Sequence, residues 1–230
     1  NLFIFPIKSL APISVDEIEL ESAGFRGDRR FMLVDAQGTF ITQRTRPDLT
    51  RFLLNVHAEG FEVWDQISGL TKLLKHNPEL LERAHVELWD DQLIVCEVGE
   101  GWSAWFSERL QEPVRLVIQL ADSPRIIAEK YQTEGSNQSS FADSLPVLLA
   151  SENSYARLAE VYGKPFDYQR FRANMIVSGT AAFEEDTWEE VSISNVRLSG
   201  AKPCARCQLV NVEPSTGEVE KGGLMKALAS

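Results

Sequence analysis

The feature that most restricts the fold is a series of short apolar segments in the first half of the chain, each followed closely by a turn. Successive segments are separated by turns such as Ala36-Gln-Gly38, Glu59-Gly60 and Trp89-Asp-Asp91. Short strands at close spacing with tight turns are typical of an antiparallel barrel or sandwich. We therefore predict strands in the first half at 2–6, 13–20, 30–35, 39–42, 53–58, 61–64, 84–88, 92–98 and 114–120.

Two segments show helical periodicity. Trp102, Trp105 and Phe106 recur at helical spacing within 101–110, and we expect the tryptophans in the core rather than in a binding site. A second helix is predicted to start within Ser151-Glu-Asn-Ser154, which offers hydroxyl and amide N-cap candidates, and to run to about 162 and end at Gly163. Its first turn is a candidate anion site, because free N–H groups there favour negative charge. Further strands are predicted at 145–150, 171–177, 189–193, 196–198 and 208–212.

These elements predict a fold class of α+β, rich in β-strand. The polar stretch 121–140 separates the strand-rich first half from the mixed second half, and we expect it to be a long connection. We place the sub-domain boundary there and divide the chain into 1–120 and 121–230. The first part is predicted to be a β-barrel-type sub-domain that packs on the second.

Composition restricts the class of function. A net charge of −11 and a pI near 4.8 would repel a phosphate backbone, so nucleic acid is not an expected partner. No apolar run is long enough for a membrane span, and the start of the chain lacks a signal-peptide pattern. Three cysteines give no disulfide framework, which predicts a reducing, cytoplasmic location.

Arginines are clustered despite the acidic composition. Each one alone is most often the partner of a surface ion pair. Several flank apolar strands rather than a helix face, which also makes them candidates for an anion pocket. The clustered residues are Arg26, Arg29, Arg30, Arg44, Arg46, Arg51, Arg170 and Arg172.

The most specific chemical motif is Cys204-Ala-Arg-Cys207. A zinc site is disfavoured, because the sequence has no second cysteine pair and no histidine at ligand spacing. A thioredoxin-like dithiol usually opens a helix after a strand, whereas this pair precedes a predicted strand, so that interpretation ranks second. Two buried thiols at a hairpin, or a thiolate ligand to a metal held mainly by a cofactor, are the other interpretations. Lys202 and Arg206 would favour the thiolate.

Several enzyme classes lack their motifs here. The chain has no Gly-x-Ser-x-Gly elbow and no histidine beside a nucleophile motif, which argues against serine or cysteine hydrolase chemistry. It also has neither a P-loop nor a Gly-x-Gly-x-x-Gly fingerprint, so those two modes of phosphate binding are not expected.

Six short motifs, specific in their order and spacing, span nearly the whole chain. They are Phe5-Pro-Ile-Lys-Ser9, Asp28-Arg-Arg-Phe-Met-Leu-Val34, Phe141-Ala-Asp-Ser-Leu-Pro146, Arg170-Phe-Arg-Ala-Asn174, Asp186-Thr-Trp-Glu189 and Pro203-Cys-Ala-Arg-Cys207. Together they resemble the MOSC family (molybdenum cofactor sulfurase C-terminal domain) preceded by its N-terminal β-barrel domain. The resemblance is closest to the YcbX-like proteins and the mitochondrial amidoxime-reducing components.

This resemblance implies a molybdenum cofactor, and pyridoxal phosphate is not expected in this chain. Cys207 would be the catalytic residue and the protein ligand to molybdenum, with Ala205 and Arg206 contributing beside it. We expect Cys207→Ala to abolish molybdenum binding with the fold intact, and Arg172→Ala to weaken cofactor retention more than Arg44→Ala. The residues that would bind the molybdopterin are Lys8, Ser9, Arg30, Asp143, Ser151, Arg172, Asn174 and Arg206.

The reaction implied by the resemblance is reduction of N-hydroxylated compounds, with N–O cleavage at molybdenum. A separate electron-donor protein is the implied partner, because the chain lacks the cysteines of a ferredoxin-like [2Fe–2S] domain. The alternative is a carrier that holds sulfur as a persulfide, or the cofactor, on Cys207. A third alternative is a dithiol oxidoreductase that uses Cys204 and Cys207.

The relation between the two sub-domains follows from the same resemblance. The cofactor is expected in the cleft between them, because both halves contribute ligands.

Proteins of this type usually continue past Glu220-Lys-Gly with strands that close the barrel, whereas this chain ends at Ser230. We therefore expect the MOSC sub-domain at 121–230 to be truncated at its C-terminus.

Overall fold

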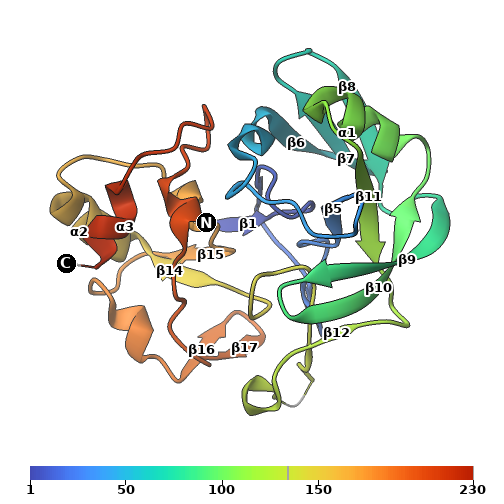
Figure 1. Cartoon of the computed structure of the whole chain (residues 1–230). Helices are drawn as coiled ribbons and strands as arrows, with labels where there is room; N and C mark the ends of the chain where they lie inside the picture. The colour runs from blue at the N-terminus through green and yellow to red at the C-terminus, as the bar shows by residue number, and fades with distance from the viewer. Residues whose placement is uncertain (134, 230) are drawn as a thin grey trace.

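The computed structural model describes residues 1–133 and 135–229, and it is an α+β structure rich in β-strand. Figure 1 shows two groups of elements side by side, one formed mainly by the first half of the chain and one by the second. The sheets within the described residues have at most four strands each, and they stay open rather than closing into a barrel. The fold class predicted from the sequence is thus confirmed, with open sheets in place of a continuous barrel wall.

The first half is built from two antiparallel sheets and one helix. A four-stranded sheet has the order β5-β11-β10-β9, and a three-stranded sheet has the order β6-β7-β8. A short pair, β3 with β4, lies beside them. The bounds are β3 Leu20–Glu21, β4 Gly24–Phe25, β5 Phe31–Asp35, β6 Phe52–His57, β7 Gly60–Asp65, β8 Thr71–Lys75, β9 Leu80–Leu88, β10 Asp91–Val98, β11 Val114–Gln119, α1 Trp102–Leu110 and the 3₁₀ helix η1 Pro47–Arg51.

The two long hairpins form where the sequence predicts them. In β10, Leu93 and Val95 are buried while Ile94 between them is exposed, the alternation of a strand with one face on the core. At the β6–β7 turn, a Cβ on Gly60 would lie 2.0 Å from the backbone oxygen of Leu74, so only glycine allows β7 and β8 to approach. The sequence analysis missed β8, although the turn before it carries the signal Ser68-Gly69, with a φ of 71° at Gly69.

One sheet joins the two halves. Its strand order is β14-β15-β1-β2, with β1 antiparallel to both of its neighbours and β14 parallel to β15. Figure 1 shows β1 at the junction between the two groups of elements. The division at residue 120 remains a prediction, and this sheet crosses it. The bounds are β1 Leu2–Ile4, β2 Ile13–Val15, β14 Leu149–Ser151 and β15 Met175–Val177.

The rest of the second half consists of helices, short strand pairs and 3₁₀ turns. Helix α2 confirms the prediction from sequence, because the Ser151 hydroxyl accepts from the N–H of Asn153 and Gly163 ends the helix with a φ of 81°. The hairpin of β16 and β17 is also confirmed. The bounds are α2 Glu152–Tyr162, α3 Gly223–Leu228, β12 Arg125–Ile126, β13 Gln138–Ser139, β16 Glu190–Ile193, β17 Val196–Ser199, η2 Glu129–Tyr131, η3 Tyr168–Phe171, η4 Glu184–Thr187 and η5 Gln208–Asn211.

Three predicted strands of the second half are wrong in whole or in part. Within 145–150 the strand begins only at Leu149. The stretch 208–212 forms the 3₁₀ helix η5, because Val210 packs against Leu158 and Leu224 instead of entering a sheet. Within 171–177 only β15 is a strand, since Arg172 has a φ of 55° and breaks the extended backbone. The predicted connection 121–140 contains the β12–β13 pair and η2, and its residue Glu134 lies outside the described residues, as does Ser230.

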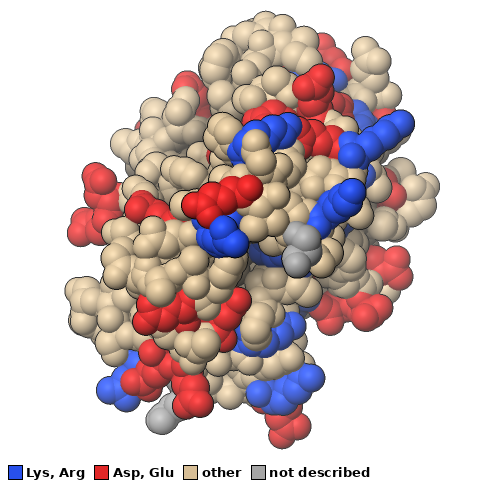
Figure 2. All heavy atoms as spheres, turned by 90° about the vertical axis from the view of Figure 1, so that its left-hand side faces the viewer, with Lys and Arg blue, Asp and Glu red and all other residues tan. Residues whose placement is uncertain are grey.

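The hydrophobic core is concentrated in the first half. Trp102 and Phe106 of α1 are fully buried there, as the helical spacing predicts, and Cys96 is buried in β10. A small cluster of Phe3, Phe5, Ala173 and Ile176 packs across the junction of the halves. Figure 2 shows basic and acidic side chains interspersed on the face formed by the second half. Within the described residues, no helix has both the length and the apolar composition to cross a bilayer.

Candidate functional site

A buried lysine lies at the start of the site, in the loop that follows β1. Lys8 donates from Nζ to the backbone oxygen of Phe141 at 2.7 Å and pairs with the Asp143 carboxylate. Its residue is only 4% exposed, and burial lowers the pKa of Lys8 to about 8 despite the nearby carboxylate. The next residue, Ser9, is also buried, and its backbone oxygen accepts from the Gln43 side chain at 2.8 Å.

Asp143 is the exposed acid of the site, with 48% of its side chain accessible. Burial of part of the carboxyl opposes ionisation, but the Lys8 ammonium outweighs it and holds the pKa of Asp143 well below its ordinary range. Arg44 also approaches, with Nη1 3.3 Å from Oδ2 of Asp143. The side chain is therefore a carboxylate at neutral pH, and it accepts hydrogen bonds from two cations.

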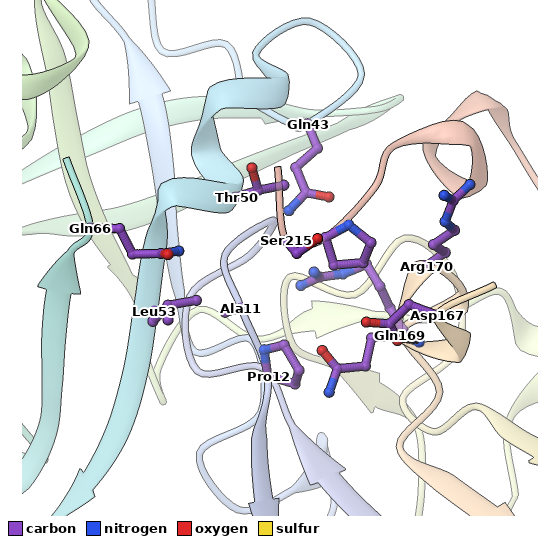
Figure 3. A pocket seen from close by; sticks show the side chains of 12 residues that line it. Ala11, Pro12, Gln43, Thr50, Leu53, Gln66, Asp167, Gln169, Arg170 and Ser215 are labelled. Atoms are coloured by element: carbon purple, nitrogen blue, oxygen red, sulfur yellow. Dashed lines mark hydrogen bonds between the residues drawn. The ribbon is translucent and has the colours of Figure 1, made fainter. Parts of the chain in front are cut away.

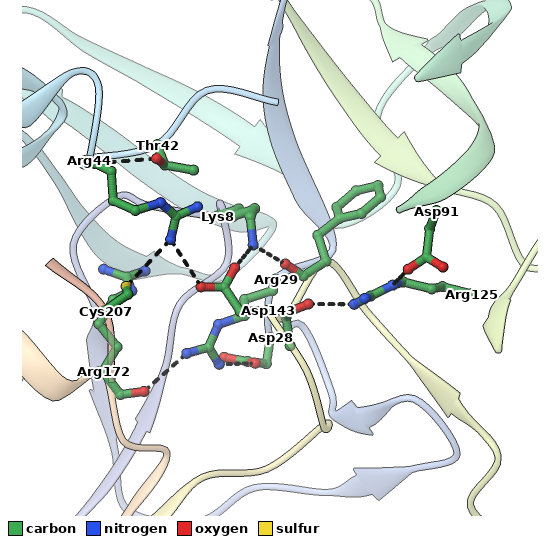
Figure 4. A network of polar contacts seen from close by, with 12 residues as sticks. Lys8, Asp28, Arg29, Thr42, Arg44, Asp91, Arg125, Asp143, Arg172 and Cys207 are labelled. Carbon is green, nitrogen blue, oxygen red and sulfur yellow. Dashed lines mark hydrogen bonds and ion pairs between the residues drawn. The ribbon is translucent and has the colours of Figure 1, made fainter. Parts of the chain in front are cut away.

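Arg44 connects this acid to the cysteine motif. Its Nη1 lies 3.6 Å from the Sγ of Cys207, and its guanidinium lies 4.5 Å from the centre of the Trp89 ring. Figure 4 shows Arg44, Asp143, Lys8 and Cys207 converging from separate elements. The sequence analysis named Arg44 only as one of the clustered arginines that could form an anion pocket, and it did not predict the contact with Cys207.

The two cysteines of the motif lie in different surroundings. Cys207 is half-buried beside Arg44, whereas Cys204 is exposed and accepts from Nη1 of Arg206 at 3.1 Å. Arg206 also donates from Nη2 to the backbone oxygen of Phe171 at 2.5 Å. Both cysteines are free thiols in a segment without regular secondary structure, rather than a buried pair at a hairpin.

A second cationic group lies on the Phe5 ring. The guanidinium carbons of Arg29 and Arg172 lie 4.6 Å and 4.2 Å from its centre. Arg172 donates from Nη1 to the backbone oxygen of Leu10 at 2.8 Å, while its Nη2 is buried without a partner in the described residues. Burial and the neighbouring Arg29 guanidinium lower the pKa of Arg172 to about 9.

Asn174 holds these elements together. Its Nδ2 donates to the backbone oxygen of Phe3 at 3.2 Å and to Oδ1 of Asp28 at 3.0 Å. Its Oδ1 accepts from the N–H of Leu148 and from Arg29, both at 3.2 Å. Both hydrogens and both lone pairs of the amide are thus used in structural contacts within the described residues, and its predicted role in binding the molybdopterin remains a prediction.

Three residues of the junction have a strained backbone. Ser9, Arg29 and Arg172 have φ angles of 66°, 49° and 55°, in the left-handed region that non-glycine residues rarely adopt. Such conformations persist where surrounding contacts determine them. Other non-glycine residues with positive φ, such as Glu100 and Gln111, lie in turns and at helix ends, so the strain is not confined to the junction.

Two of the expected binding residues lie apart from the group formed by Lys8, Arg44, Asp143 and Cys207, which we call the junction cluster. Arg30 reaches the backbone oxygen of Gln119 at 3.4 Å, on the β11 side. Ser151 is fully buried, caps α2 and contacts the Thr180 hydroxyl at 2.8 Å. Within the described residues neither side chain contacts the junction cluster, and the role of both in binding remains a prediction.

Arg172 lines a cavity of about 250 Å³, to which none of the four residues of the junction cluster contributes. Figure 3 shows that its lining comes from both halves of the chain. Gln43, Thr50 and Gln66 line it from the first half, and Gln169 and Ser215 from the second. Within the described residues there is no group of three or more histidine, cysteine or acidic side chains that could hold a metal by itself. A metal at this site would need most of its ligands from a cofactor.

Comparisons with known proteins match both halves. The model of the MOSC N-terminal beta barrel domain matches residues 1–113, and that of the MOSC domain matches 136–230. The chain is 31% identical to mitochondrial amidoxime reducing component 2 of Bos taurus, covering all of this chain and 70% of that protein. It is 28% identical to the human mitochondrial amidoxime-reducing component 1, with the same coverage of each.

A third relative is much longer. The chain is 29% identical to molybdenum cofactor sulfurase of Bos taurus over 95% of its own length, but it spans only 27% of that protein. Both domain matches, and the relative that is 31% identical over the whole chain, agree with the motifs at the junction of the halves. The chain therefore belongs to the MOSC family, with a MOSC N-terminal beta barrel domain followed by a MOSC domain.

Proposed function

We propose that the protein is a molybdenum-cofactor-dependent oxidoreductase that reduces N-hydroxylated compounds. The observation that carries this proposal is the junction cluster. There Arg44 contacts both the thiol of Cys207 and the carboxylate of Asp143, and Lys8 pairs with the same carboxylate. A soft ligand beside cations suits a group that contains both a thiophilic metal and anionic oxygens. The relatives named for molybdenum cofactor and amidoxime reduction support the same class.

The residues present fit such a cofactor. The Nη2 of Arg172 is buried without a partner, which costs free energy unless an acceptor arrives. The cavity beside it is polar and lies between the two halves, so an anionic group of the cofactor placed there would supply that acceptor. Cys207 would bind the metal, and Lys8 and Arg172 would hold the anionic part.

The protein's own residues would bind and orient the substrate. When bound, the cofactor supplies the two-electron redox chemistry. Asp143 is the exposed member of the cluster and remains ionised, so it would accept a hydrogen bond from the N–H or O–H of an N-hydroxylated substrate. Arg44 would hold Asp143 and Cys207 in place, because one nitrogen contacts both. Electrons would come from a separate donor protein.

The cellular setting is part of the proposal. Cys204 and Cys207 are free thiols, one of them exposed, which fits a reducing compartment such as the cytoplasm. A single soft ligand such as Cys207 stays available to a metal only where it is kept reduced.

Metal analysis of the full-length protein, produced in a host that makes molybdopterin, tests the proposal. The parent protein and Cys204→Ala are expected to contain about one molybdenum per chain, and Cys207→Ala none, with unchanged circular dichroism, because only Cys207 lies in the cluster. Retention of molybdenum in Cys207→Ala would overturn the ligand assignment. Loss in both variants would point to a role for the whole motif instead.

A sulfur-carrier function is the second candidate. It is favoured by the match to proteins named molybdenum cofactor sulfurase and by the position of Cys207 beside a guanidinium, which stabilises an anionic sulfur. In that case the peptide containing Cys207 would carry the mass of one added sulfur atom in protein purified without molybdenum. An unmodified Cys207 together with bound molybdenum would exclude this candidate.

A further inference from the structure

Two cations of the junction cluster lie against an aromatic pair from the first half of the chain. The rings of Phe40 and Trp89 are 5.1 Å apart between their centres. The guanidinium of Arg44 lies 4.5 Å from the centre of the Trp89 ring and 5.8 Å from that of Phe40. The Nζ of Lys8 lies 5.7 Å from the centre of the Phe40 ring. Cations within about 6 Å of a ring centre are attracted to the ring, so this aromatic pair supports both of them.

Trp89 occupies a turn position that does not require a tryptophan. Its φ of 57° lies in the left-handed region, which glycine and asparagine adopt at lower cost. The residue is 45% exposed, so its side chain is not part of the core either. The indole ring therefore matters for what it touches, and it touches Phe40 and Arg44.

The same turn is connected to the loop that carries Asp143. Asp91, the first residue of β10, accepts from Nε of Arg125 at 2.6 Å, and Arg125 donates from Nη1 to the backbone oxygen of Ala142 at 2.5 Å. Arg125 is only 9% exposed, so its charge depends on the Asp91 carboxylate for compensation. Figure 4 shows Asp91 and Arg125 in one network of polar contacts with Asp143.

The loop before Asp143 is fixed at its start and exposed at its end. Phe141 is fully buried in a cluster with Leu88 of β9 and Leu93 of β10, and its N–H donates to the backbone oxygen of Arg29 at 3.0 Å. Asp143 itself has 48% of its side chain accessible. The hydrogen bond from Arg125 lies between these two points, so the place of the carboxylate depends on it.

We propose that the β9–β10 turn positions two members of the junction cluster. Its Trp89 holds Arg44 in place, and its Asp91 holds the Asp143 loop through Arg125. Both are positioning residues, because they act through other side chains. The inference rests on the proposed function for what the cluster binds, but the contacts themselves are independent of it. It also gives a structural role to an arginine of the stretch 121–140, which the sequence analysis treated as a connection.

Hydrogen exchange of the full-length protein tests the contact made by Asp91, and the measurement does not require molybdenum. Asp91→Ala leaves the buried Arg125 guanidinium without its carboxylate, so Arg125 should release the backbone oxygen of Ala142. The amides of 140–141 are hydrogen-bonded in this loop, and we expect them to exchange about tenfold faster in the variant. Asp91→Glu should restore slow exchange.

A neighbouring aspartate provides the matched control. Asp90→Ala removes the same charge from an exposed position of the same turn, and it should leave exchange at 140–141 unchanged. Peptide mass spectrometry of the loop compares the variants. Equal exchange in Asp91→Ala and Asp90→Ala would overturn the role of Asp91.

The rate of molybdenum dissociation tests the contact made by Trp89. Trp89→Leu keeps an apolar side chain against Phe40 but removes the ring on which Arg44 lies, so dissociation should be about threefold faster. In an Arg44→Ala background the same substitution should have no further effect, because Trp89 acts through Arg44. Trp64→Leu, at an exposed tryptophan of β7, is the control and should not change the rate. Equal increases in the two tryptophan variants, or additive effects of Trp89→Leu and Arg44→Ala, would contradict the proposal.

Substrate kinetics separate positioning from a general loss of stability. With benzamidoxime as the substrate, Asp91→Ala should raise KM about threefold and change kcat less, with the thermal midpoint within about 2 °C of the parent. In an Asp143→Asn background it should have no further effect on KM. A lower thermal midpoint with parallel losses of kcat and molybdenum would show a merely structural role. A parent protein that neither binds molybdenum nor reduces benzamidoxime would refute the proposed function, whereas hydrogen exchange would still decide the positioning.

Discussion

The β9–β10 hairpin and the segment around Asn174 differ in what determines their conformation. Strands β9 and β10 pair residue by residue across a tight turn, so nearby sequence specifies both partners. Asn174 instead contacts Asp28 and Phe3, which are 146 and 171 residues away in sequence. The hairpin region is therefore locally determined, whereas the junction that carries the candidate site depends on distant contacts. We therefore expect single substitutions at the junction to change stability or cofactor retention more than substitutions at exposed hairpin positions do.

The largest expected effect is loss of stability at the junction. Asn174→Ala removes one of the hydrogen bonds of the buried Asp28 carboxylate and those to two backbone groups, and it should lower the free energy of unfolding by about 3 kcal/mol. Asn55→Ala, at an exposed position of β6, should change it by less than about 0.5 kcal/mol. Denaturant titration of both variants measures the difference. Similar losses of stability in the two variants would show that Asn174 matters no more to the fold than an exposed asparagine on β6.

Arg44 and Arg46 are close in sequence, but only Arg44 contacts the junction cluster, so substitutions at the two positions should affect cofactor retention differently. Arg44→Ala removes the contact shared by Asp143 and Cys207, and we expect cofactor retention to fall about tenfold with a small change in stability. Arg46 pairs with Asp48 and Glu112 within the first half, so Arg46→Ala should leave retention unchanged. Molybdenum content after gel filtration is the measurement. The expectation that Arg172→Ala weakens cofactor retention more than Arg44→Ala remains a prediction, although Arg44 belongs to the junction cluster.

The charge on Lys8 should make the rate of cofactor dissociation depend on pH. Because burial lowers the pKa of Lys8 to about 8, its ammonium is present at pH 7 and is lost as the pH rises through that value. The fraction of charged Lys8 falls about tenfold between pH 7 and pH 9, and cofactor dissociation should accelerate over the same range. In Lys8→Met the dissociation rate should be faster at pH 7 and nearly flat with pH. An unchanged slope in that variant would assign the pH dependence to another group.

The smallest effect is expected at the start of α2. Ser151 caps the helix, so Ser151→Ala should cost about 1 kcal/mol of stability. Its molybdenum content should equal that of the parent protein, because no contact connects Ser151 to the junction cluster. Thermal unfolding and metal analysis on the same samples measure both quantities. Lost metal with unchanged stability would instead place Ser151 in the pocket.

The sequence was sufficient where structure is local. The turns at Gly38 and Gly60 and the caps of α2 are specified by single residues whose conformational preferences are strong. Helix α1 follows from the spacing of its aromatic residues, and its tryptophans are core residues as expected. The motif that contains Cys207 was also visible, because its chemistry lies in adjacent residues.

Sequence reasoning failed where distant packing determines the outcome. The stretch 208–212 has a strand-like composition, yet contacts with α2 and α3 hold it as a 3₁₀ helix. The contacts of the Asn174 amide with Asp28 and Phe3 were not visible in the sequence either, and the binding role assigned to Asn174 stays a prediction. The position of Arg44 beside Cys207 is likewise a consequence of how the two halves meet.

The position of β1 between β2 and β15 has a consequence for biosynthesis. Leu2 of β1 pairs with Met175 of β15, so the two partners of this contact are synthesised far apart in time. During translation, β1 can pair with β2 early, but its other edge stays open until β15 leaves the ribosome. An open strand edge invites pairing with another chain. Pausing of the ribosome before residue 175 would therefore prolong the aggregation-prone stage, and faster delivery of the second half would raise the yield of soluble protein.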